Sequence, residues 1–213
     1  MSRYSGDDHY IDPESGVLKN LLDITDQATL DSAEADFVAA RSRELVLKPL
    51  SGRFNLPHLQ AVHKHLFRDV YEWAGRLRDV NISKNGTAFA TAMYIESSAA
   101  QLFQQLAHEK ALAGLGRAEF SIRAAYYFGE LNAIHPFREG NGRTQREFIS
   151  HLAHANGFYI AWEKWKQSEM IQASVESFHG NTSKLSGFIL GNLHPRTENV
   201  PSTSPKHKEK LPR

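Results

Sequence analysis

Residues 135–146 read HPFREGNGRTQR, which brings a histidine, an acid, two glycines and arginines into twelve residues. A helix-friendly run, TQREFISHLAHAN, completes and extends this segment. We therefore expect the Gly140-Asn141-Gly142 turn at a helix N-terminus, where free backbone N–H groups and the helix dipole favour an anion. The segment predicts a site that holds a triphosphate.

Two side chains of this segment have chemistry suited to group transfer. His135 is its only ring-nitrogen base, and an ordinary pKa of about 6.5 lets it take a proton from an attacking hydroxyl at neutral pH. Glu139 offers hard oxygen ligands, and triphosphate chemistry normally needs Mg²⁺ to bridge phosphate oxygens. We predict that His135 is the general base, that Glu139 binds Mg²⁺ and that Phe137 between them is buried.

The glycines and arginines are expected to hold phosphate. Gly140 and Gly142 allow positive φ or close backbone approach, so the turn can aim N–H groups at one phosphate, with Asn141 adding a side-chain donor. Arg143 and Arg146 fall about 60° apart on a helix, where two guanidinium groups can clamp adjacent phosphates. A solvated turn would need neither the second glycine nor the paired arginines. The predicted phosphate-binding residues are Arg138, Gly140, Asn141, Gly142, Arg143 and Arg146.

Bulk composition limits the class of protein. The 213 residues have a net charge of +1, 41% hydrophobic and 23% charged residues, and no cysteine. Near-neutral charge disfavours a general nucleic-acid binder, and the missing cysteines fit a reducing compartment. No signal peptide is evident, and no apolar run approaches the roughly 18 residues of a membrane span. We expect a soluble, cytoplasmic protein with no membrane contact.

Hydrophobic periodicity predicts an all-α protein interrupted by one hairpin. Helices are expected from Thr25, from Leu56 to Gly75, over residues 95–112 and 120–131, from the motif to about Asn156, and over 168–178 and 182–192. Residues 76–94 lack a helical period, and Asn85-Gly86 is a strong hairpin turn. The motif loop thus lies between two helices. The predicted organisation is an N-terminal arm (1–24), one domain (25–193) and a disordered or linker tail (194–213).

The motif matches, position for position, the Fic family signature H-x-F-x-[D/E]-G-N-G-R-x-x-R. The chain resembles Fic proteins over about residues 25–193, and its N-terminal segment resembles Fic toxins inhibited by a separate small antitoxin. The resemblance implies the Fic fold and transfer of AMP from ATP to a Tyr, Ser or Thr hydroxyl of a target protein. It makes a bacterial source and a type II topoisomerase target plausible.

The resemblance also implies a role for the hairpin as a flap that covers the nucleotide and docks the target. Lys84, Asn85, Thr87 and Phe89 are the candidate flap residues. Fic proteins can be restrained by a helix bearing [S/T]-x-x-x-E-[G/N], and this sequence encodes none. We therefore expect a partner chain to deliver the inhibitory glutamate to Arg146.

Two other functions stay open at this point. One is transfer of another phosphate-linked group, or of the γ-phosphate itself. The other is a nucleotide-gated binding module without turnover, although a pure binder has little need for His135.

Overall fold

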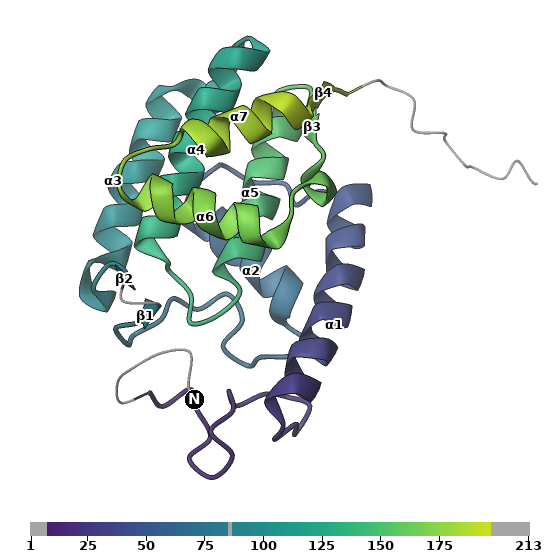
Figure 1. Ribbon diagram of the computed structural model, residues 1–213, viewed down its shortest axis with the longest axis vertical. Helices are drawn as coiled ribbons and strands as arrows, with labels where there is room; N and C mark the ends of the chain where they lie inside the picture. The colour runs from purple at the N-terminus through teal and green to yellow at the C-terminus, as the bar shows by residue number, and fades with distance from the viewer. Residues whose placement is uncertain (1–7, 85–86, 197–213) are drawn as a thin grey trace, which may run out of the picture.

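Helices dominate the computed structural model, which describes residues 8–84 and 87–196 (Figure 1). The α-helices are α1 (Gln27–Leu47), α2 (Leu56–Phe67), α3 (Ile95–His108), α4 (Arg117–Ile134), α5 (Asn141–Ala155), α6 (Gln167–Phe178) and α7 (Ser183–Asn192). Short 3-10 turns are η1 (Ala92–Tyr94), η2 (Lys110–Leu112) and η3 (Trp162–Lys164). The strands are β1 (Ser83–Lys84), β2 (Thr87–Ala88), β3 (Phe158–Ile160) and β4 (Leu193–Pro195). The predicted all-α class with a short hairpin is confirmed.

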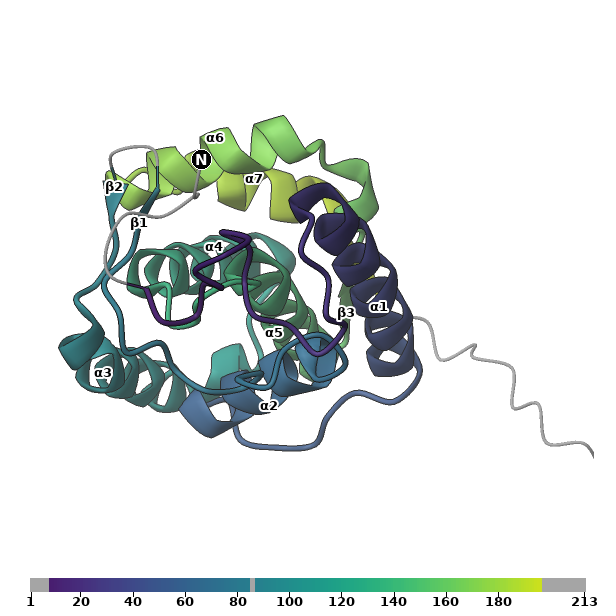
Figure 2. The same ribbon diagram turned by 90° about the horizontal axis from the view of Figure 1, so that it is seen from below.

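Helix α4 lies in the middle of the bundle, with α3, α5, α6 and α7 around it (Figure 2). Its buried side chains form one core with those of α5, including Phe120, Leu131 and Phe148. A second core joins the N-terminal arm to α1 and α2, with Tyr10 and Leu30 among its members. Burying these apolar faces stabilises the arrangement in which α5, the helix that follows the motif loop, is held on both sides.

Capping residues define where the first two helices begin. The Asp26 carboxylate accepts from the Thr29 backbone N–H, and the Asn55 side chain accepts from that of His58. Each satisfies a donor that the first helical turn would otherwise leave free. Pro57, in the first turn of α2, needs no such partner because it has no N–H.

Two sequence-based boundaries differ from the structure. Helix α2 ends at Phe67 rather than near Gly75, because the chain then folds through tight turns that still bury Val70 and Trp73. The predicted tail from residue 194 begins too early, because β4 (Leu193–Pro195) pairs antiparallel with β3. Both errors have the same cause, because the spacing of apolar residues does not reveal which distant segment of the chain packs against them.

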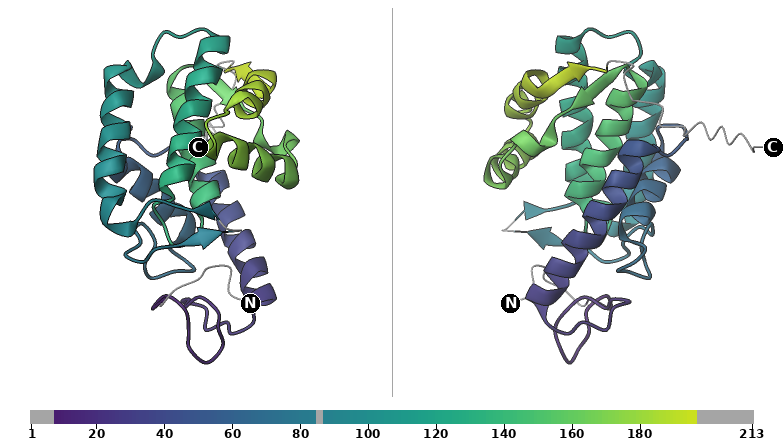
Figure 3. Two further views of the ribbon diagram at one scale, coloured as in Figure 1. Left: turned by 60° about the vertical axis from the view of Figure 1, so that its left-hand side comes forward. Right: turned by 90° about the vertical axis from the view of Figure 1, so that its right-hand side faces the viewer.

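The arm, the β1–β2 hairpin and the loop after α4 gather at one end of the bundle, and the β3–β4 pair lies at the other (Figure 3). Arm residues 8–24 are attached by the buried side chains of Tyr10 and Val17 and by a hydrogen bond from Leu21 N–H to the Val70 carbonyl. The motif loop is thus covered by segments from the first half of the chain.

Within the described ranges, no helix has both the length and the apolar character needed to cross a membrane.

Candidate functional site

The motif loop connects α4 to α5 through two residues with left-handed backbone. His135 caps the C-terminus of α4 at φ 48°, and Gly140 caps the N-terminus of α5 at φ 78°. A Cβ added to Gly140 would lie 2.2 Å from the Phe67 ring, so only glycine fits there. Gly142 differs, because it lies in the first turn of α5 with open space where a Cβ would be. An anion can therefore approach the N-terminus of α5 beside Gly142.

The environment of His135 determines which of its nitrogens is basic. Its Nδ1 lies 3.2 Å from the Asn132 carbonyl oxygen. A carbonyl oxygen can only accept, so Nδ1 carries the proton and Nε2 keeps its lone pair. Phe89 stacks on the ring at a centroid distance of 3.8 Å, and burial lowers the pKa of His135 to about 4. Nε2 is therefore unprotonated at neutral pH and able to accept a proton.

The backbone carbonyl of Glu139 is fixed by His63, while its carboxylate is partly exposed. The buried His63 of α2 donates through Nε2 to the Glu139 carbonyl oxygen at 3.0 Å and accepts at Nδ1 from the Gly75 N–H at 2.8 Å. The His63 ring also stacks on Phe137 at 3.9 Å. Phe137 is buried as expected. The Glu139 carboxylate accepts from the Gly140 N–H at 2.9 Å.

The two arginines of α5 have opposite surroundings. Nη2 of Arg143 lies 2.6 Å from Oε1 of Glu34, a buried residue of α1, and 3.7 Å from Oε1 of Glu139. Arg146 lies against α6, with Nη1 2.9 Å from Sδ of Met170, and forms no ion pair with any residue in the described ranges. Burial, reinforced by the Arg143 charge, lowers the pKa of Arg146. A partly desolvated cation without a carboxylate favours an anionic ligand.

Two of the predicted phosphate-binding side chains are used elsewhere. The Arg138 guanidinium is buried and bonded to Asp8 of the arm, with Nε 2.6 Å from Oδ2. The Asn141 side chain is buried too, accepting from the Phe137 N–H at 2.9 Å and donating to the Phe137 carbonyl at 2.7 Å. The Arg138 side chain attaches the arm and the Asn141 side chain fixes the loop, and phosphate binding by either of them stays a prediction.

Arg78 is a buried residue of the site that sequence analysis missed. Its Nε donates to the His135 carbonyl at 2.8 Å, and its Nη1 to the Val80 carbonyl at 2.7 Å. Its Nη2 donates to the Ala90 and Ile134 carbonyls. A cation at the C-terminus of α4 is favoured by the helix dipole, and here Arg78 connects the hairpin segment to the motif loop. A lone arginine before a hairpin offered no signal in the sequence, and neither did His63 within an apolar helix.

The flap residues differ in how close they lie to His135. Lys84 of β1 is exposed and pairs in register with Thr87 of β2, which is half-buried. Phe89 covers His135 directly, as described above. Asn85 lies outside the described residues. The structure therefore brings Phe89 to His135 and leaves Lys84 at the surface.

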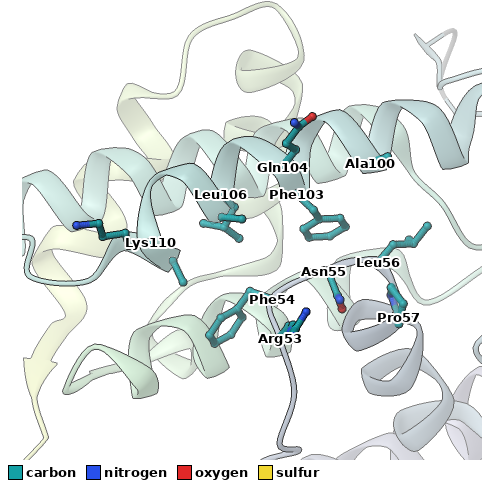
Figure 4. A pocket seen from close by; sticks show the side chains of 12 residues that line it. Arg53, Phe54, Asn55, Leu56, Pro57, Ala100, Phe103, Gln104, Leu106 and Lys110 are labelled. Atoms are coloured by element: carbon teal, nitrogen blue, oxygen red, sulfur yellow. The ribbon is translucent and has the colours of Figure 1, made fainter.

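Two hollows flank the bundle. One, of about 590 Å³, is lined by the flap residue Phe89, by Ile134 and by polar groups of α3 and α4 such as Gln101 and Glu130. The other, of about 630 Å³, lies between the start of α2 and the C-terminal half of α3, with Phe54 and Phe103 on its walls (Figure 4). Only the first has lining residues next to His135, so the second is separate from the motif.

The residues present fit a magnesium ion only if a substrate completes its coordination. Across the described residues, no group of three or more His, Asp or Glu side chains is arranged to hold a metal. Glu139 is the one carboxylate of the motif loop. Mg²⁺ is commonly bound by one or two carboxylates together with phosphate oxygens and water. A single carboxylate beside the N-terminus of α5 is compatible with that mode.

Comparison with known proteins gives a consistent family assignment. Residues 53–153 match the profile of the Fic/DOC family. The chain is 52% identical over 200 residues to protein adenylyltransferase VbhT of Bartonella schoenbuchensis, covering 93% of this chain and 42% of that protein. It is 36% identical over 180 residues to the probable protein adenylyltransferase Fic of Escherichia coli K12, covering 84% of this chain and 89% of that protein.

Solved structures agree with the sequence relatives. The BepC effector of Bartonella tribocorum, crystallised with bound AMPPNP, superimposes with a TM-score of 0.81 at 27% identity, covering 88% of this chain and 97% of that one. The chain therefore shares its fold with a relative whose structure contains a bound nucleotide. Since the motif, the fold and relatives above 30% identity over most of the chain agree, this chain belongs to the Fic/DOC family.

Proposed function

We propose that this chain transfers AMP from ATP to a Tyr, Ser or Thr hydroxyl of a target protein. The observation that carries the proposal is the basic Nε2 of His135 in the loop that leads into α5, the helix whose Arg146 has no carboxylate partner among the described residues. The names of the adenylyltransferase relatives and the AMPPNP bound to BepC support it. The chain spans 42% of the length of VbhT.

In the proposed reaction, the target hydroxyl gives its proton to Nε2 of His135 as its oxygen attacks the α-phosphorus. The bond from the α-phosphorus to the bridging oxygen breaks, and pyrophosphate leaves with that electron pair. The N–H groups at the start of α5 hold phosphate oxygens, and Arg143 and Arg146 neutralise the outer phosphates. Glu139 would hold Mg²⁺, which supplies charge neutralisation on the phosphate oxygens when bound.

Labelling of proteins in a bacterial lysate tests this function. Purified chain, ATP labelled on the α-phosphate and Mg²⁺ should label at least one protein band, and His135→Ala should abolish the label. Equal labelling by the variant would remove His135 as the base. Mass spectrometry of the labelled band separates AMP transfer from transfer of another phosphate-linked group. Nucleotide binding with no label in any lysate would support the binding-module alternative.

We also propose that activity is restrained by a small antitoxin chain, as part of a toxin-antitoxin pair. Arg146 has no carboxylate partner in the described residues, so a glutamate from outside can pair with it and occupy the position of the outer phosphate. A helical peptide bearing the [S/T]-x-x-x-E-[G/N] motif should inhibit labelling, and its Glu→Gln counterpart should not. Equal inhibition by both peptides would contradict the proposal.

The target is proposed to be a bacterial type II topoisomerase subunit. Purified subunits incubated with the chain, labelled ATP and Mg²⁺ should take up the label on a Tyr, Ser or Thr. If other lysate proteins are labelled and the topoisomerase subunits are not, the transfer reaction stands and this target is wrong.

A further inference from the structure

Glu34 is a buried carboxylate that sequence analysis gave no role. It lies on α1, is 6% exposed and forms the closest ion pair of the motif arginine Arg143, at 2.6 Å. The two residues are 109 positions apart in the chain. Burying a charged side chain without a partner costs free energy, and Arg143 is the cation that lies against Glu34.

Arg143 lies between two carboxylates that compete for the same nitrogen. Its Nη2 is 2.6 Å from Oε1 of Glu34 and 3.7 Å from Oε1 of Glu139. The guanidinium also lies over the Phe67 ring, with Cζ 4.8 Å from the centroid, and this contact restricts its movement. The shorter distance shows that Glu34, and not the motif acid, is the principal partner of Arg143.

The position of Arg143 affects how readily Glu139 can bind a metal ion. A guanidinium in close contact with a carboxylate satisfies its oxygens and opposes the approach of a divalent cation, because both cations seek the same negative charge. With Glu34 present, Arg143 is drawn toward α1 and its contact with Glu139 stays long. If the charge of Glu34 is removed, Glu139 is the one of these two carboxylates that remains for Arg143 to contact.

We propose that Glu34 is a positioning residue that holds Arg143 closer to α1 than to Glu139 and thereby limits the competition between Arg143 and a divalent cation for the Glu139 carboxylate. The proposal rests on the Mg²⁺-dependent function proposed above. It predicts an effect on metal-dependent binding that a general loosening of α1 would not produce.

The test compares nucleotide binding with and without metal. Calorimetric titration with AMPPNP, in excess Mg²⁺ and again in EDTA, gives the factor by which Mg²⁺ tightens binding. In Glu34→Gln this factor should fall at least about fivefold. Binding in EDTA should be unchanged or tighter, because a negative charge near the phosphates has been removed. Replacing Glu34 in an Arg143→Ala background should leave the factor unchanged, since Arg143 transmits the effect.

Asp69→Asn is the matched control. Asp69 lies just after α2 and pairs with Arg41 of α1, the helix that carries Glu34, at 2.6 Å. No ion pair joins Asp69 to the described residues of the motif. This variant should keep the wild-type metal factor. The proposal is overturned if Glu34→Gln also keeps it, or if Glu34→Gln weakens binding equally in Mg²⁺ and EDTA. Failure of the wild-type chain to bind AMPPNP or to label any protein would instead overturn the proposed function.

Discussion

The motif loop has two flanks that treat its charges differently. The N-terminal flank, residues 8–90, supplies Asp8 to Arg138, Glu34 to Arg143, and Arg78 to the carbonyls that end α4. The C-terminal flank, α6 and α7, contributes the thioether of Met170 to Arg146 and, among the described residues, no carboxylate to either arginine of α5. The N-terminal flank therefore fixes the loop through ion pairs and hydrogen bonds, whereas the C-terminal flank leaves the charge of Arg146 without a carboxylate partner among the described residues.

The largest expected effect comes from removing the central cation of the N-terminal flank. Arg78→Met should lower the free energy of unfolding by about 3 kcal/mol or more, because several buried carbonyls lose their donor at about 1 kcal/mol or more each. Urea unfolding followed by circular dichroism measures this. Arg76→Met, at an exposed neighbouring position, should change stability by under about 0.5 kcal/mol. Similar losses in both variants would contradict the role of Arg78.

The two arginines of α5 test the comparison most directly. Arg146→Met should weaken AMPPNP binding roughly 10- to 100-fold, since a charged hydrogen bond contributes about 1.5–3 kcal/mol. It should not lower stability, because burial already disfavours its charge. Arg143→Met should weaken binding and also lower stability, because Glu34 is left buried without its cation. Calorimetry measures the loss of AMPPNP binding, and urea unfolding measures the loss of stability in both variants. Equal losses of stability would remove the distinction between the flanks.

A pH dependence follows from His63. Burial lowers its pKa to about 3, from about 6.5 in the unfolded chain. The unfolded state therefore takes up a proton that the folded state refuses. Stability is retained above about pH 6.5 and falls by about 1.4 kcal/mol per pH unit as the pH decreases below that value. Denaturant unfolding at pH 7 and pH 5 gives the change in the free energy of unfolding with pH. In His63→Gln this change should be smaller, because the variant lacks the proton that His63 takes up on unfolding. The exposed His108→Gln variant should keep the wild-type slope.

The smallest effect concerns the flap. Phe89→Leu keeps an apolar side chain but removes the ring stacked on His135, a contact that contributes about 0.5–1.5 kcal/mol. With less cover, the pKa of His135 should rise from about 4 toward its ordinary value. An NMR titration of the histidine ring protons measures this shift. Met93→Leu, at an exposed site in η1, should leave it unchanged. An unaltered His135 pKa in Phe89→Leu would show that other groups bury the histidine.

Much of the fold could be predicted because its determinants are local. Leu102 and Leu106 of α3, like Phe148 and Leu152 of α5, recur at helical spacing, and each of those helices was predicted close to its observed bounds. The failures are the end of α2 and the β3–β4 pair, where the covering segment is far away in the chain. Periodicity records only that a side chain is apolar, and not what it packs against.

The sequence by itself determined the chemistry of the loop. His135, Glu139 and Gly140 lie within six residues of one another, and the need for a glycine at positive φ is a local backbone requirement. Only the tertiary structure decided how each charge is used: Arg138 bonds Asp8 across 130 residues, Arg143 bonds Glu34 across 109, and Arg146 receives no carboxylate from the described chain. Ion pairing depends on distance in space, and folding sets those distances through cores to which the motif contributes little more than Phe137 and the buried face of α5.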